Sequence, residues 1–203
     1  MILETIEQLE ATYSSAVPAA AKISDLRYLI PPYIKLIEAS PFFLMATSGP
    51  EGMDCSARGD SPGFVQVRDE RTIIFPDRRG NNKIDSLRNI VHDPRVALLF
   101  LVPPTGIILR VNGRAQISIA EELLEKFRVG SALPKSVLIV TVEVAMMQCA
   151  RALMRSKLWD AASYTDPKSI PTVGDVLACA SQGRDGGQQF DQAASARMEQ
   201  TLW

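Results

Sequence analysis

Alternation of apolar and polar side chains in two segments constrains the fold of this chain more than any other feature. In residues 107–119, arginine, asparagine, glutamine and serine fill positions between apolar side chains, and residues 137–147 alternate in the same way. Successive side chains of a β-strand point to opposite faces, so both segments predict strands with one buried face. The expected core positions are Ile107, Leu109, Val111, Ala115, Ile117 and Ile119 in the first strand and Leu138, Val140, Val142, Val144 and Met146 in the second.

Five further segments have the length and composition of short strands. Residues 42–48 and 54–58 flank the turn sequence GPEGM and predict a hairpin. Residues 63–67 and 72–76 flank RDER and predict a second hairpin. The apolar run 95–102 lies between proline-containing turns and predicts a strand covered on both faces. About seven strands with few helices between them predict an α+β, mainly β fold: an antiparallel barrel, whose closure removes exposed strand edges.

Helical patterns flank the predicted barrel. The helix that precedes it is interrupted at Pro31 and Pro32, because proline is tolerated at a helix start but not inside a helix. The expected helices cover residues 3–16, 23–39, 121–130, 170–181 and 191–203, with a loop at 181–189.

The chain shows no internal repeat and no second domain. Its 203 residues, 46% of them hydrophobic, suffice for one substantial core. We therefore expect a single domain over residues 1–203, with a helical N-terminal extension at 1–40, a barrel core at 41–160 and a helical C-terminal tail at 161–203.

Composition excludes several classes of protein. With 22 Lys+Arg against 23 Asp+Glu, the net charge of −1 provides no overall basic field for nucleic acid or an anionic membrane, so any anion site must be local. The N-terminus has no signal-peptide pattern, and no segment reaches the roughly 18 apolar residues of a membrane span. Three widely spaced cysteines disfavour a disulfide framework, which indicates a cytoplasmic protein. A single histidine, His92, and no CxxC pair argue against a metal site.

The polar turn DRRGNNK, residues 77–83, precedes the helical pattern of residues 84–91. Asn81 or Asn82 is suited to cap a helix that begins near Lys83. In this helix Ile84, Leu87 and Val91, with Ile90 beside them, are expected to face the barrel.

A helix N-terminus favours a bound anion. Arg78, Arg79 and Lys83 add full charges at the same place, and Gly80 allows the backbone to approach a ligand closely. The turn therefore predicts phosphate binding, with a solvated loop and a simple helix cap as the alternative.

A second basic site lies at the end of a predicted strand. In SARGDSPGF, residues 56–64, Arg58 is followed by Gly59. In a small barrel this strand can lie beside the one that ends at Pro76, so Arg58 and the turn can converge on one anion. The alternative for Arg58 is a surface charge at the end of a hairpin.

Three segments together, SARGDSPGFVQV, IIFPDRRGNNKIDSLRNIVHDPRVALLF and LRVNGRAQI, resemble the pyridoxamine 5'-phosphate oxidase-like flavoprotein family, the FMN-binding split barrels. The resemblance covers about residues 40–160 and lies nearer to a little-characterised branch than to pyridoxamine phosphate oxidase proper. It implies an antiparallel split β-barrel with flanking helices.

The resemblance also implies a site. Arg58 occupies the place of an arginine that contacts the FMN phosphate or ribityl chain. Asn81, Asn82 and Lys83 occupy the family's phosphate-binding turn; because Asn82 replaces the usual arginine or serine, Arg78 or Arg79 is expected to supply the missing charge. Backbone amides near residues 57–60 and 76–78 are expected at the edge of the flavin ring. The cofactor-binding candidates in these segments are Arg58, Gly59, Pro76, Asp77, Arg78, Arg79, Gly80, Asn81, Asn82 and Lys83.

A further segment, MQCARALMRSKLWD, resembles the family's stretch that lies against the flavin of the neighbouring subunit. In it, Trp159 is expected to cover the ring and Arg155 to meet its polar rim or the substrate, while core packing is the alternative for the tryptophan. The family implies a homodimer with two FMN sites at the interface, for which the polar face of residues 107–119 is suited.

The implied function is an FMN-dependent oxidoreductase acting on an unidentified small molecule. The alternatives are a deazaflavin-dependent enzyme, a haem-binding relative, which the lone histidine disfavours, and a flavin-binding protein without turnover. No catalytic acid or base is evident: His92 suits a helix C-terminus, and Cys55 has no accompanying base. The oxidation of a B6 phosphate is disfavoured because residues 184–203 contain no histidine.

Overall fold

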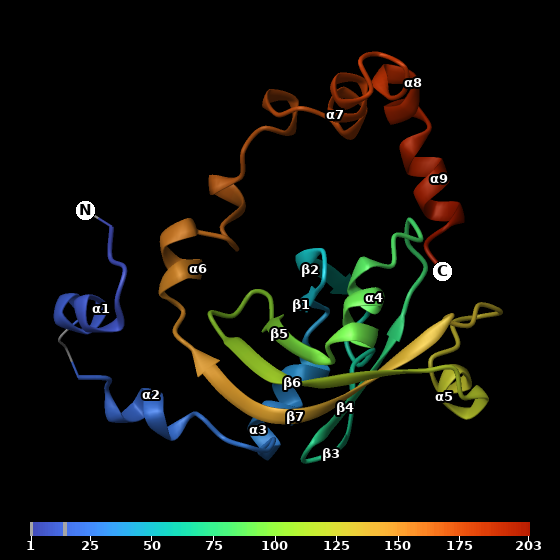
Figure 1. Cartoon of the computed structure of the whole chain (residues 1–203). Helices are drawn as coiled ribbons and strands as arrows, with labels where there is room; N and C mark the ends of the chain where they lie inside the picture. The colour runs from blue at the N-terminus through green and yellow to red at the C-terminus, as the bar shows by residue number, and fades with distance from the viewer. Residues whose placement is uncertain (1, 14–15) are drawn as a thin grey trace.

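The computed structural model describes residues 2–13 and 16–203 and contains a seven-stranded sheet that curls on itself (Figure 1). The strand order is β2-β1-β5-β6-β7-β4-β3, and every pair of neighbours is antiparallel. The predicted α+β, mainly β fold with flanking helices is confirmed. The strands are β1 (Phe42–Gly49), β2 (Gly52–Gly59), β3 (Gln66–Asp69), β4 (Thr72–Asp77), β5 (Arg95–Leu101), β6 (Ile108–Ser118) and β7 (Ser136–Gln148).

Both predicted hairpins form. β1 and β2 pair over their whole length, from Phe42 opposite Gly59 to Gly49 opposite Gly52. The strand expected at residues 63–67 begins instead at Gln66, because the chain bends before it.

Aromatic side chains fill the centre of the barrel. The ring centroid of Phe43 lies 4.9 Å from that of Phe75 and 4.9 Å from that of Phe100, and all three side chains are fully buried. The Phe64 ring stacks on Phe43 at 5.8 Å. Burying each such ring stabilises the fold by about 1.5–3 kcal/mol.

A β-bulge in the pairing of β6 with β7 changes which residues of β7 point into the core. Asn112 pairs with Val144 and Gly113 with Val142, so Glu143 is the extra residue. Strict alternation fails at this point, and the prediction that Val144 and Met146 lie on the core face is wrong: both are only partly buried, whereas Ala145 is fully buried. The far end of β6 also departs from expectation, since Ile119 lies outside the strand and is 77% exposed.

Within the described residues, the helices that precede the barrel are α1 (Ile6–Thr12), α2 (Ala19–Ile23) and α3 (Pro31–Ala39). The predicted helix at 23–39 is wrong in its first half, because the prolines begin α3 instead of interrupting a longer helix. α3 buries Tyr33 and Ile37 in the barrel core. Residues 14 and 15, which belong to the helix predicted at 3–16, and residue 1 lie outside the described residues.

The helices α4 (Asp85–His92) and α5 (Glu121–Lys126) lie between strands of the barrel. α4 begins two residues later than expected, at Asp85, and its N-cap residue is Ile84, without a side-chain cap. The prediction that Asn81 or Asn82 caps this helix is therefore wrong.

The buried face of α4 matches the predicted one only in part: Ile90 is buried and Leu87 packs against the barrel core, as expected. The buried residues are Ser86, Asn89 and Ile90, whereas Val91 is 77% exposed. The cause is a polar contact: Asn89 Nδ2 donates to Thr47 Oγ1 on β1 at 3.1 Å, which turns the polar residues of the helix toward the sheet.

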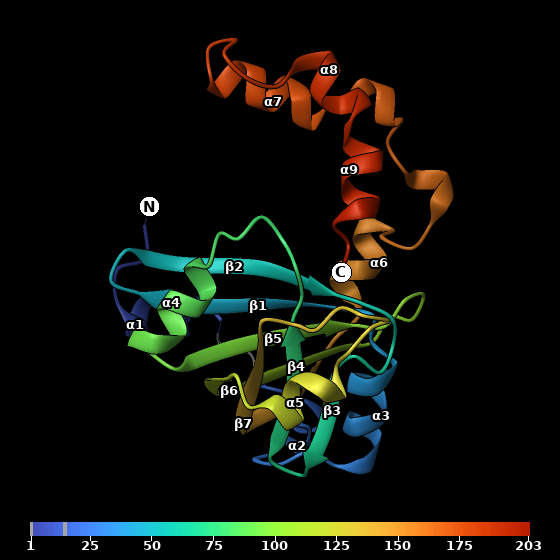
Figure 2. The ribbon, with the colours of Figure 1, turned by 90° about the vertical axis from the view of Figure 1, so that its right-hand side faces the viewer.

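The C-terminal segment forms an arch over one side of the barrel (Figures 1 and 2). It leaves the barrel after β7, stands away from the sheet, and returns so that residue 203 lies beside the barrel. The loop expected at 181–189 is shorter, because α8 already begins at Gly187. The arch consists of α6 (Arg151–Ser156), the 3₁₀ turns Ala161–Ser163 and Pro167–Ser169, α7 (Val173–Ala180), α8 (Gly187–Gln192) and α9 (Ala194–Gln200).

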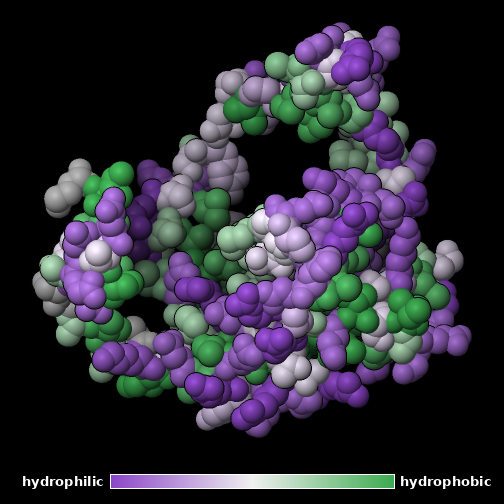
Figure 3. Space-filling model, in the orientation of Figure 1, coloured by the Kyte–Doolittle hydropathy of each residue, from purple (hydrophilic) through white to green (hydrophobic). Residues whose placement is uncertain are grey.

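An opening separates the arch from the barrel, and hydrophobic residues gather on the arch (Figure 3). None of the helices in the described ranges is long and apolar enough to cross a membrane. The exposed apolar side chains of the arch include Tyr164, Ile170, Val173, Val176 and Met198.

Candidate functional site

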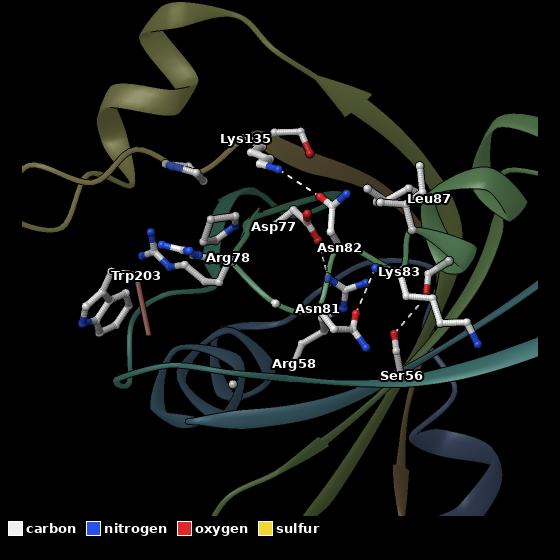
Figure 4. A pocket seen from close by; sticks show the side chains of 18 of the residues that line it. Ser56, Arg58, Asp77, Arg78, Asn81, Asn82, Lys83, Leu87, Lys135 and Trp203 are labelled. Carbon is white, nitrogen blue, oxygen red and sulfur yellow. Dashed lines mark hydrogen bonds and ion pairs between the residues drawn. The ribbon is translucent and has the colours of Figure 1, made fainter. Parts of the chain in front are cut away.

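A cavity of about 830 Å³ lies where β2, β4 and the start of α4 come together. Its volume falls in the range of small-molecule and cofactor sites, roughly 300–1,000 Å³. Figure 4 shows its polar side chains, which come from segments far apart in the sequence. The cavity is lined by residues 56–59, Phe64, 76–84, Ser86, Leu87, 132–136 and Trp203.

Arg58 and the turn at 77–83 meet in this cavity. β2 and β4 are not neighbours in the sheet, but Arg58 Nη1 donates to Asp77 Oδ1 at 2.5 Å, and both side chains are 17% exposed. The structure thus brings together ten of the residues selected from the sequence, which are Arg58, Gly59 and residues 76–83.

The Nε atom of Arg58 is buried and has no hydrogen-bond partner among the described residues. A buried charged donor without an acceptor is costly, by several times the net value of an ordinary hydrogen bond. Arg58 lines the cavity, so an anionic ligand there would meet a guanidinium whose hydrogen-bonding capacity is not used up within the fold. The donor set therefore fits a phosphate group.

Arg78 has a structural role. Its Nε donates to Asp60 Oδ2 at 2.7 Å and its Nη1 to the backbone oxygen of Phe127 at 2.5 Å. Its guanidinium also lies 5.2 Å from the ring centroid of Trp203 (Figure 4), a cation–π contact. Arg79, by contrast, is exposed and makes no ion pair or hydrogen bond with the described residues. Of the two arginines, Arg79 is the one available to an anion.

Lys83 and Asn81 shape the end of the turn. Asn81 Oδ1 accepts a hydrogen bond from the Lys83 backbone N–H at 2.9 Å, which closes an Asx turn instead of capping α4. The Lys83 ammonium lies 3.1 Å from Asp85 Oδ2, and this hydrogen bond raises the pKa of Lys83 above its ordinary value. Lys83 is therefore charged at neutral pH.

Asn82 adopts a left-handed backbone conformation, with φ of 61°. Asparagine tolerates this conformation better than most residues. Its Oδ1 accepts a hydrogen bond from Lys135 Nζ at 2.9 Å (Figure 4). This contact ties the turn to the loop before β7 and brings a further cation to the cavity.

The cavity is cationic although the whole chain is nearly neutral. The single acidic side chain in its described lining is Asp77. The basic side chains in the lining are Arg58, Arg78, Arg79, Lys83 and Lys135. The fold therefore gathers a local cluster of cations, the form that any anion site must take in a chain with a net charge of −1.

Some expected backbone donors are already used. The amide of Asp60 donates to the oxygen of Pro41 at 3.1 Å, and Pro76 has no N–H. These two positions do not offer the ring-edge hydrogen bonds expected near residues 57–60 and 76–78.

Two selected residues lie elsewhere. Trp159 and Arg155 are not part of the cavity lining of their own chain. The indole Nε1 of Trp159 donates to the backbone oxygen of Thr105 at 2.9 Å, and Arg155 is exposed on α6. The structure does not bring these two residues to Arg58.

Several residues that line the cavity were not predicted from the sequence. Lys135 follows α5 in a loop without a recognisable motif, and Trp203 is 126 positions from Asp77 by the numbering. Ser56 stands on the same face of β2 as Arg58, two residues earlier, so alternation along the strand was the signal that could have identified it.

The match to known families decides the classification. The model of the pyridoxamine 5'-phosphate oxidase family matches residues 32–149, more than half of the chain. The chain belongs to this family. The resemblance seen in the sequence is thereby confirmed, and the matched range contains the strands and the turn that form most of the cavity.

Comparison with solved structures finds remote similarities. A HupZ protein of Group A Streptococcus is 19% identical with a TM-score of 0.48, covering 60% of this chain and 94% of that chain. General Stress Protein 26 of Bacillus anthracis is 16% identical with a TM-score of 0.43, covering 56% and 88%. An F420 reductase is 20% identical with a TM-score of 0.41, covering 59% and 98%. No curated protein matches the sequence.

Proposed function

We propose that the cavity binds FMN and that the protein is an FMN-dependent oxidoreductase acting on a small molecule. The observation that carries this proposal is the buried Nε of Arg58, a charged donor without a partner in a cationic cavity of a pyridoxamine 5'-phosphate oxidase family member. When bound, FMN supplies hydride and electron transfer through its isoalloxazine ring.

The phosphate of FMN would be held by Arg58 from one side and by the turn from the other. Arg79, Lys83 and Lys135 add positive charge, and the N-terminus of α4 has no side-chain cap competing for its amides. Asp77 holds Arg58 in place, and Asn82 fixes Lys135 beside the turn. The chain's own residues thus bind and orient the cofactor, while the chemistry belongs to the flavin.

We further propose that two copies of the chain form a homodimer and that Arg155 and Trp159 act at the cofactor of the partner subunit. Their position outside the cavity of their own chain is compatible with this role. The outward face of β6, with exposed Arg110, Arg114 and Gln116, offers a polar surface for the contact.

The proposal is tested with the purified full chain. After reconstitution with FMN and removal of free ligand, we expect one bound FMN per chain, with its visible absorption retained on the protein. Anaerobic addition of NADH or NADPH is then expected to bleach the flavin. A protein that retains F420 but not FMN would show that the cavity is a deazaflavin site. Bound FMN that neither NADH nor NADPH reduces, and that passes no electrons to an added acceptor after reduction by dithionite, would indicate a flavin-binding protein without turnover.

A further inference from the structure

A chain of three hydrogen-bonding side chains reaches the cavity from its outer side. Ser86 Oγ, on α4, donates to Asp54 Oδ2 on β2. Ser86 Oγ also lies 3.0 Å from Ser56 Oγ. Ser56 and Ser86 line the cavity, whereas Asp54 does not. The chain therefore runs from a carboxylate outside the cavity to a hydroxyl inside it.

The number of hydrogens in this chain fixes its direction. A carboxylate has acceptors only, and each serine has a single hydroxyl hydrogen. Because the hydrogen of Ser86 goes to Asp54, the hydrogen between the two serines must come from Ser56. Ser56 then has no hydrogen left, and its oxygen offers the cavity lone pairs alone.

Burial preserves this direction. Ser86 is 5% exposed, so solvent has little access to its hydroxyl and the bond to Asp54 has little competition from water. Asp54, Ser56 and Arg58 follow one another at every second position of β2 and share one face of the strand. On this face Arg58 presents a donor and Ser56 presents an acceptor.

We propose that Ser56 is a specificity residue that accepts a hydrogen bond from a hydroxyl group of the bound ligand and makes no contact with its phosphate. This inference rests on the proposed function, in which the neighbouring Arg58 binds the phosphate. The hydroxyl group that donates to Ser56 belongs to the ribityl chain of the flavin. Asp54 and Ser86 act through Ser56 and are positioning residues.

The test is a set of fluorescence titrations with three flavins: FMN, riboflavin, which lacks the phosphate, and lumiflavin, which lacks the ribityl chain as well. Ser56→Ala is expected to weaken FMN and riboflavin equally, by about 5- to 10-fold, as for one lost neutral hydrogen bond. Lumiflavin affinity is expected to stay unchanged, which also shows that the variant is folded. Ser61→Ala, an exposed serine outside the cavity, is the matched control.

Each other result contradicts the assignment. A loss confined to FMN means that Ser56 donates to the phosphate. An equal loss for all three flavins means that the serine only packs, and no loss means that it has no role. Wild-type protein that binds none of the three overturns the proposed function itself.

A double variant tests the positioning role of Asp54. Asp54→Ala is expected to weaken riboflavin when Ser56 is present, because Ser56 loses its fixed orientation. It is expected to change nothing further in the Ser56→Ala background. Equal losses in both backgrounds would show that Asp54 acts independently of Ser56.

Discussion

Arg58 Nη1 lies 2.5 Å from Asp77 Oδ1 and so joins β2 to β4, two strands that share no hydrogen bonds in the sheet. The ion pair satisfies one donor of the guanidinium and leaves the buried Nε without a partner. Asp77 therefore aims Arg58 without neutralising all of its binding capacity. This relationship supports the account of the cavity as a phosphate site.

Removal of Arg58 tests the phosphate contact. Arg58→Ala is expected to weaken FMN by about 1.5–3 kcal/mol, the value of a hydrogen bond to a charged group. Riboflavin affinity is expected to change little, because riboflavin has no phosphate. Isothermal titration with both ligands measures the difference. Arg71→Ala removes an exposed arginine outside the cavity and serves as the control. Equal losses for FMN and riboflavin would refute the phosphate assignment.

The same comparison applies to Lys83. This lysine is exposed and already paired with Asp85, so Lys83→Ala is expected to weaken FMN less than Arg58→Ala does. The smaller loss should also diminish as salt is added, because exposed charges are screened.

Asp77 is expected to have opposite effects on folding and on binding. Asp77→Asn removes the charge that pairs with Arg58, and the free energy of unfolding of the ligand-free protein should fall by about 1–3 kcal/mol. FMN affinity should rise, since the whole charge of Arg58 becomes available to the phosphate. Chemical denaturation and titration measure the two quantities. A variant that loses FMN affinity would instead show that the positioning of Arg58 by Asp77 outweighs the charge that Asp77 offsets.

Substitution of Gly80 tests whether the bound ligand approaches the turn closely, separately from any effect on folding. A Cβ atom at Gly80 would meet nothing within 4 Å, so Gly80→Ala should leave the melting temperature unchanged while weakening FMN. The contrasting variant is Gly113→Ala. A Cβ there would lie 2.2 Å from the backbone oxygen of Thr141, and crowding of this kind costs about 1–3 kcal/mol. Unchanged FMN affinity in Gly80→Ala would exclude close approach of the ligand to this turn.

Trp203 connects the arch to the cavity through Arg78. Trp203→Ala removes the cation–π contact, worth about 0.5–1 kcal/mol at an accessible site. We expect faster proteolysis of the arch and weaker flavin binding, whereas Trp203→Phe should retain most of both. Limited proteolysis with and without FMN measures the first effect. Proteolysis that is unaffected by Trp203→Ala would show that this residue does not hold the arch.

Much of the fold followed from local pattern. Alternation located β6 and β7, and the turn residues between short apolar runs located both hairpins. The errors have a common cause, which is that tertiary contacts override local preference. Asn89 turns a polar face of α4 toward Thr47, and the bulge at Asn112 and Gly113 shifts the buried positions of β7.

The candidate site was predictable where its residues lay in one motif. Arg58 and the turn at 77–83 were found from charge, glycine and asparagine, and the fold places them in one cavity. Lys135 and Trp203 were not found, because only the folded chain brings them to the turn. The contacts of Arg78 could not be predicted either, because Asp60 and the backbone of Phe127 are not its sequence neighbours.

The most direct measurement is isothermal titration of the full wild-type chain with FMN and with riboflavin under identical buffer conditions. The account predicts that FMN binds at least about 10-fold more tightly, because the phosphate gains a charged hydrogen bond from Arg58. It also predicts that added salt reduces the FMN affinity and leaves the riboflavin affinity nearly unchanged. Equal affinities for the two flavins, or no binding of either, would contradict the central claim that this cavity is an FMN site.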